Sequence, residues 1–249
     1  MAGPRSWLLV HAEHSGDWLF ALPLASCGLH LDDEAVRVAV CLRLGLDVCS
    51  SHECHCGSAV DVRGIHSFIC QKAPGKIMRH QALNDSIARS FSAADVPVTK
   101  EPSGLLRSNG KRPDGLSLVP WQSGKALCWD VTVICPLADS YISDAAREPG
   151  SVAKLAAYRK EAKYAALDGR YMFVPISFEN LGVPNASVKL LLTHLVRRLS
   201  EKSGESRETS FLFQRCSVLL SVLTLFFYMT VCLLVTARNF RHTQPFHFH

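Results

Sequence analysis

Apolar residues recur at helical spacing in the middle of the first half of the chain. In residues 76–94, Leu83, Ile87 and Phe91 are four residues apart, which places them on one face of a helix. Pro97 follows and cannot continue a helix, so it closes the segment. The pattern therefore predicts a helix with one buried face.

Three further segments have a helical pattern. Residues 32–44 begin with paired acids, which the positive end of the helix dipole favours, and continue with mostly apolar positions. Residues 151–167 are predicted to be helical, and residues 187–200 form an amphipathic pattern that ends near Gly204. We expect a helix in each segment.

Short β-prone runs lie between these helices. Residues 96–101, 116–119 and 126–135 are separated by Ser-Asn-Gly-Lys and Gln-Ser-Gly-Lys turns, and this arrangement predicts a strand meander. Residues 171–178 are apolar and β-prone and follow the third helix. The order of helix, three strands, helix, strand and helix predicts a mixed α/β fold.

A cysteine- and histidine-rich segment from 49 to 70 has no sustained periodicity. It contains two close pairs of soft donors, which suit tetrahedral zinc: Cys54 with Cys56, and His66 with Cys70. We expect a loop-dominated knuckle whose fold comes from a structural zinc ion and not from an apolar core. Such a site would support folding or nucleic-acid contact.

Other interpretations of the cysteine-rich segment stay open. Cys49, His52 and His55 are competing ligands, and the cysteines could instead be buried free thiols beside surface histidines. The chain has ten cysteines, and its start lacks the apolar core and cleavage site of a signal peptide. We therefore expect a reducing compartment, where clustered cysteines bind metal more often than they pair.

Length and charge set broad limits on organisation and partners. A chain of 249 residues can bury one good core together with a small metal-stapled subdomain. Its 27 Lys and Arg against 22 Asp and Glu give a net charge of +5, which permits a polyanionic partner without requiring one.

Residues 218–237 form a charge-free apolar run that is long enough to span a bilayer. Arg215 precedes the run, and Arg238 and Arg241 follow it. On hydropathy alone the run is a transmembrane helix.

Two aspartates point to hydrolytic metal chemistry. Asp114 follows a proline at the start of one predicted strand, and Asp130 lies inside the next, where an unpaired carboxylate would be costly. If these strands are hairpin neighbours, both carboxylates can hold one Mg²⁺ or Mn²⁺ ion, since such hard cations prefer oxygen ligands. The expected role is metal-assisted cleavage of a phosphodiester.

Basic side chains on the following helix can reach the same point. Lys160, Lys163 and Tyr164 are three and four residues apart and share a face, from which a lysine could position water or neutralise a phosphate. Alternatively, the lysines are a solvated face, Asp114 is a turn residue, and Asp130 is a core carboxylate paired with Arg112.

Together these strings resemble the C-terminal part of non-LTR retrotransposon polyproteins that carry a restriction-like endonuclease downstream of the reverse transcriptase. The resemblance covers roughly four-fifths of the chain. The matching sequence motifs are, in chain order, SGDWL, LDDE, CxCG with GxHxxxC, RH with LND, EP, KRPDG, WDVTV, the KxxxY spacing of Lys160 and Tyr164, Gly182 and FLFQR.

The resemblance implies a restriction-endonuclease-like core and metal-dependent nicking of target DNA, which exposes a primer for reverse transcription. It implies that Asp114 and Asp130 are the metal-binding acids and that Lys160 and Tyr164 act beside them, with Glu101 as an additional acid. Thr132 stands where many restriction enzymes have a lysine, so the basic group must come from the helix. Nothing in the chain resembles a reverse transcriptase palm domain.

These observations divide the chain into an N-terminal helical segment (1–48), a CCHC knuckle (49–75), an endonuclease core (76–215) and an apolar tail (216–249). The tail begins where the resemblance stops, and we interpret it as an out-of-frame extension unrelated to the fold or as a membrane anchor. The expected partner is DNA, with element RNA as another, and the expected site of action is the nucleus. A binding module without cleavage and a membrane-tethered protein are the competing functions.

Overall fold

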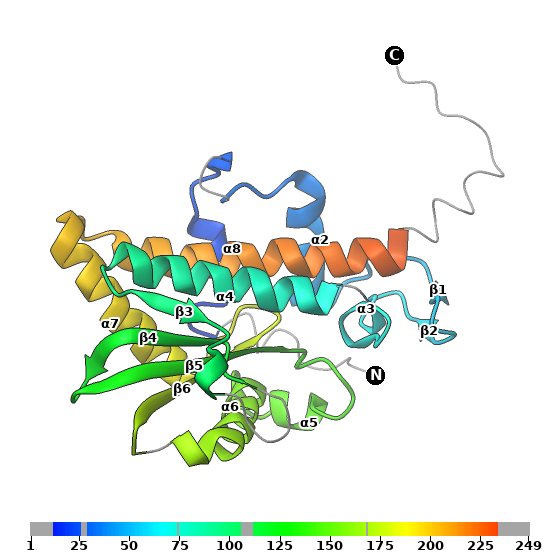
Figure 1. Cartoon of the computed structure of the whole chain (residues 1–249). Helices are drawn as coiled ribbons and strands as arrows, with labels where there is room; N and C mark the ends of the chain where they lie inside the picture. Colours follow the sequence, from blue (N-terminus) through cyan, green and yellow to red (C-terminus); the bar gives the residue numbers. More distant parts are fainter. Residues whose placement is uncertain (1–11, 26–28, 74, 106–111, 168, 234–249) are drawn as a thin grey trace.

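A four-stranded sheet with helices on both faces lies at the centre of the computed structural model (Figure 1). The predicted mixed α/β fold is therefore confirmed. The structure describes residues 12–25, 29–73, 75–105, 112–167 and 169–233.

The sheet has the order β3-β4-β5-β6 and follows the predicted meander. Strands β3 (Val98–Lys100), β4 (Gly115–Gln122) and β5 (Lys125–Ile134) pair antiparallel, and β6 (Tyr171–Glu179) pairs parallel to β5. A parallel pair needs a crossover connection. Helix α6 (Ser151–Tyr164) lies between β5 and β6 in the chain and forms that connection.

Helices cover the sheet in layers (Figure 1). Helices α4 (Gly75–Ala93) and α7 (Ala186–Ser203) pack on one face, and α6 (Ser151–Tyr164), continued by η4 (Ala165–Leu167), packs on the other. All four predicted helices are present, including α2 (Asp33–Leu44). The Asp32 side chain caps α2, and Gly45 ends it in a left-handed conformation.

Trp129 of β5 is fully buried at the centre of the main core, where its ring stacks on Phe91 of α4 with 5.1 Å between centroids. Gly115 of β4 faces the same indole. A Cβ atom on Gly115 would lie 2.0 Å from Trp129 Cζ2. The close approach of the two strands at this point therefore depends on a residue without a side chain.

We expect Gly115→Ala to lower the free energy of unfolding by about 1–3 kcal/mol, because the added methyl group overpacks a core that cannot give way. Urea denaturation measures the change. Gly104→Ala is the matched control, since a Cβ there meets nothing within 4 Å. Equal losses in both variants would contradict the prediction.

Helix α8 (Glu208–Tyr228), extended by the π-turn η5 (Met229–Leu233), contains most of the apolar run. It packs against α4, α7 and α2, and its Thr224 hydroxyl donates to the carbonyl of Asn180 at 3.1 Å. The expectation that this run has no relation to the fold is wrong for residues 218–232. The expected boundary at residue 216 falls inside a single helix.

One described helix, Glu208–Cys232, is long and apolar enough to cross a membrane, although more than half of its most apolar window is buried inside the fold. Core helices of soluble proteins pass the same test, so it is weak evidence for an anchor. The membrane anchor stays a prediction, and residues 234–237 of the run lie outside the described residues.

Several short elements have no counterpart among the predicted ones, because periodicity needs longer segments than these. They are η1 (Asp17–Phe20), β1 (His52–Glu53), β2 (Ala59–Val60), α3 (His66–Ile69), η3 (Ser103–Leu105) and α5 (Ile142–Ala145). Of these, β1, β2 and α3 belong to the cysteine-rich segment described next.

Candidate metal centre and active-site cavity

The four predicted zinc ligands come together in the structure. The ligand atoms of Cys54, Cys56, His66 and Cys70 all lie within 4.8 Å of one another. Cys54 Sγ and Cys70 Sγ are 3.8 Å apart, which is about the separation of two sulfurs each about 2.3 Å from one tetrahedral ion. This Cys3His group could hold a zinc ion.

Short elements place these ligands. Strands β1 and β2 form a small antiparallel pair, and the turn between them carries Cys54 and Cys56. Gly57 adopts a left-handed conformation, with φ of 88°, and its amide donates to the carbonyl of Cys54 at 2.8 Å. Helix α3 begins at His66, and the amide of Cys70 donates to the His66 carbonyl, which brings the second pair together.

The two sulfurs of the first pair differ in their surroundings. Burial raises the pKa of Cys54 to about 11, whereas hydrogen bonds from Ser58 lower the pKa of Cys56 to about 6. The lowered pKa of Cys56 favours the thiolate, the form that binds metal.

The competing ligands have other neighbours. Both ring nitrogens of His52 lie within hydrogen-bond distance of backbone carbonyls, those of Ser50 and Val231. Cys49 Sγ lies 3.4 Å from the carbonyl of Asp61. His55 is exposed. None of the three belongs to the Cys3His group found among the described residues.

The knuckle shares an apolar core with the rest of the protein, so the expectation that it has none is wrong. Val60 and Phe68 of the knuckle are buried in one cluster with Leu42 of α2 and with Phe227 and Tyr228 at the end of α8. The Tyr228 hydroxyl donates to the carbonyl of Val48. The knuckle is therefore supported from outside as well as by its candidate metal group.

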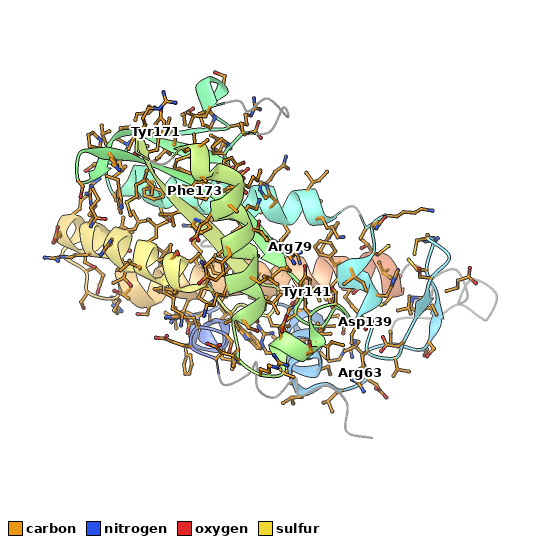
Figure 2. All side chains as sticks on the ribbon, turned by 90° about the horizontal axis from the view of Figure 1, so that it is seen from below. Arg63, Arg79, Asp139, Tyr141, Tyr171 and Phe173 are labelled. Carbon is orange, nitrogen blue, oxygen red and sulfur yellow. The ribbon has the colours of Figure 1, made fainter. Side chains whose placement is uncertain are left out.

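A cavity of about 590 Å³ lies beside the knuckle and contains the predicted acidic and basic residues. Helix α3, helix α4, strand β5 and helix α6 form its walls. The charged residues that line it are Asp114 and Asp130, together with Lys76, Arg79, Arg112, Lys160 and Lys163. Arg79 and Tyr141, which are labelled in Figure 2, both line the cavity. The basic side chains outnumber the acidic ones, which suits a phosphate-bearing ligand.

Asp130 has the partners that a buried carboxylate needs. Its side chain is 4% exposed and forms ion pairs with Lys160 through Oδ1 and with Lys163 through Oδ2. The Tyr164 hydroxyl also contacts Oδ2. Burial and the Asp130 carboxylate raise the pKa of Tyr164, so the phenol stays protonated. The predicted convergence of Lys160, Lys163 and Tyr164 on Asp130 is therefore observed, and Arg112 is not its partner among the described residues.

Asp114 immediately precedes β4, the strand that pairs with the Asp130 strand β5, as the hairpin arrangement requires. Its amide donates to the carbonyl of Trp129 at 2.9 Å, and its Oδ2 accepts from the amide of Val131 at 2.6 Å. The Asp114 side chain is 14% exposed. Both aspartates line the same cavity, which fits the expected shared site.

His80 and Asn84 of α4 also contact Asp114, and sequence reasoning assigned them no role. His80 Nε2 is 2.8 Å from Asp114 Oδ2, and this carboxylate raises the pKa of His80. The Asn84 amide donates to the Asp114 carbonyl at 3.1 Å. The sequence signal that could have identified them is their spacing of four residues, which places both side chains on one face of the helix that precedes the two acids.

Glu101 lies apart from the other predicted catalytic residues. Its side chain is 57% exposed and forms an ion pair with Arg112, and it is not among the residues lining the cavity. The structure therefore does not bring Glu101 to the site.

Comparison with protein-family models and with curated proteins gives no match to this chain. The cavity and its side chains therefore carry the functional argument.

Proposed function

We propose that this chain is a divalent-metal-dependent DNA endonuclease module that nicks target DNA, as the resemblance to the retrotransposon restriction-like endonucleases implies. The observation that carries the proposal is the meeting of Asp130 with Lys160, Lys163 and Tyr164 in a cavity that Asp114 also lines. Acids and lysines around one point in a basic cavity are the groups that phosphodiester hydrolysis uses.

The donor set fits Mg²⁺ or Mn²⁺. Magnesium binds through one or two carboxylates and keeps several waters, and Asp114 and Asp130 supply two carboxylates at an open cavity. When bound there, the ion stabilises charge on the scissile phosphate and lowers the pKa of the attacking water. Asp114 and Asp130 would hold it.

The remaining groups act on the substrate directly. Lys160 and Lys163 lie with side chains 23% and 25% exposed, so their ammonium groups can reach a phosphate in the cavity and neutralise its charge. Tyr164 holds Asp130 in place through its hydroxyl, which also lies 2.9 Å from the Arg112 carbonyl. DNA is the proposed partner, together with element RNA, and the nucleus is the proposed site of action.

The contacts of the Asp130 carboxylate with two lysines and a tyrosine favour a second candidate function, a nucleic-acid-binding module without cleavage. Lys160, Lys163 and Tyr164 contact both carboxylate oxygens of Asp130, so a cation at this carboxylate must displace the Lys160 ammonium. If that exchange does not occur, the basic cavity binds phosphates and cuts nothing. Such binding would weaken steeply with salt.

The test is nicking of supercoiled plasmid by the full chain with Mg²⁺ or Mn²⁺. We expect nicking by the wild type and its loss, to the level of a chelator control, in Asp130→Asn. Asp139→Ala removes an exposed acid that does not line the cavity and should nick like the wild type. Circular dichroism verifies that each protein is folded.

Salt-sensitive DNA binding by folded wild-type protein without metal-dependent nicking would reject the endonuclease and support the binding module. Nicking that survives in Asp130→Asn would show that the activity does not come from this cavity.

A further inference from the structure

Two side chains on one face of helix α4 contact Asp114, just before β4, and Trp129 of β5. His80 and Asn84 are four residues apart, so they lie one helical turn from each other. His80 Nε2 lies 2.8 Å from Asp114 Oδ2. Because an ionised carboxylate only accepts hydrogen bonds, the imidazole is the donor.

Asn84 links the backbone before β4 to the side chain of Trp129 on β5. Its amide nitrogen donates to the Asp114 carbonyl at 3.1 Å, and its Oδ1 accepts from Trp129 Nε1 at 2.8 Å. Asn84 is only 5% exposed. A buried amide that is bonded at both ends fixes the groups it joins, which are Asp114 itself and the residue next to Asp130.

The bonds to Asp114 favour one of its oxygens. Within the described part of the chain, Oδ2 takes the donors from both His80 and the Val131 amide. Oδ1 is then the oxygen free to bind an ion in the cavity. Removing the His80 donor would leave the carboxylate held by one hydrogen bond, from the Val131 amide, and able to rotate.

We infer that His80 and Asn84 are positioning residues, and that His80 holds the Asp114 carboxylate in the orientation that binds a divalent cation. The inference rests on the proposed function, because it assumes a cation at Asp114 and Asp130. It makes α4 part of the active site, although α4 supplies no metal ligand. Outer-sphere partners of this kind typically change metal affinity about 10- to 100-fold when they are removed.

The test is titration of the full, zinc-loaded chain with Mn²⁺ at fixed pH, with free Mn²⁺ followed by electron paramagnetic resonance. We expect His80→Ala to weaken Mn²⁺ binding about 10- to 100-fold. His80→Gln keeps a donor at the place of Nε2 and should bind within about threefold of the wild type. Gln81→Ala, at an exposed neighbouring position on α4, is the control and should bind like the wild type.

Wild-type affinity in His80→Ala, or equal losses in His80→Ala and His80→Gln, would overturn the inference. So would Mn²⁺ binding that is unchanged by Asp114→Asn, because the ion would then lie elsewhere. Mn²⁺ binding that depends on Asp114 and His80, in a protein that does not nick plasmid, would support the positioning role and reject the proposed endonuclease. The two proposals therefore fail separately.

Discussion

Replacing Cys54 with serine is expected to remove bound zinc and loosen the knuckle while leaving the central sheet folded. Cys54 is buried beside Cys70, and serine supplies a poorer ligand for zinc. A structural zinc site contributes its binding energy to folding, which amounts to about 4 kcal/mol when free zinc is a thousandfold above the dissociation constant. Metal analysis of the purified proteins and thermal unfolding measure the two effects.

The shared apolar cluster limits how far this damage spreads. Val60 and Phe68 pack with residues of α2 and α8, whereas Trp129 and the sheet belong to a separate cluster. Hydrogen exchange should therefore lose protection in β1, β2 and α3 before β5. His55→Ala is the matched control, since His55 is exposed and outside the Cys3His group, and it should keep one zinc per chain. Full zinc content in Cys54→Ser would contradict the assignment.

Local patterns were sufficient for the long elements and for the side chains that share one element. The helical period of residues 76–94 and 151–167 anticipated α4 and α6, and the 160, 163 and 164 spacing anticipated the contacts with Asp130. These features depend on neighbours within a few residues. The meander was also predictable: the Gln-Ser-Gly-Lys turn joins β4 to β5, whereas the predicted Ser-Asn-Gly-Lys turn lies outside the described residues.

Contacts between distant segments were not predictable in the same way. His80 and Asp114 are 34 residues apart, and the sequence of α4 alone does not show which loop packs against its polar face. Hydropathy likewise cannot distinguish a membrane helix from a helix buried by its own protein. A polar stripe on α8, formed at helical spacing by Ser217, Ser221 and Thr224, was the available sequence signal that this helix is buried by protein. Ser217 accepts from the Trp18 amide, Ser221 donates to the Ser217 carbonyl, and Thr224 donates to the Asn180 carbonyl.

Glu179 leads to a second large prediction, a loss of stability between about pH 4.5 and 7. The residue ends β6, is fully buried and accepts a hydrogen bond from the Ala153 amide at the start of α6. Its Oε2 is buried and has no hydrogen-bond partner within the described part of the chain. Burial raises the pKa of Glu179 to about 7, and the backbone amides at the start of α6 oppose that shift only in part.

The raised pKa fixes the sign of the pH dependence. Between the unfolded pKa of 4.5 and the folded pKa of about 7, the folded state binds more protons than the unfolded state. The contribution of Glu179 to stability must therefore fall as pH rises through this window and become constant above it. A difference of about 2.5 pKa units corresponds to a loss on the order of 3 kcal/mol.

Glu179→Gln removes the ionisation while keeping an oxygen that can accept from Ala153. We expect the variant and the wild type to be equally stable near pH 4.5, and the variant to be more stable by up to about 3 kcal/mol at pH 8. Urea denaturation of both proteins across this range gives the difference, in which the titration of the other groups cancels. Glu161→Gln, at an exposed position, should leave the pH dependence unchanged. A constant difference between Glu179→Gln and the wild type would mean that Glu179 has the same pKa in the folded and unfolded states, which would contradict the prediction.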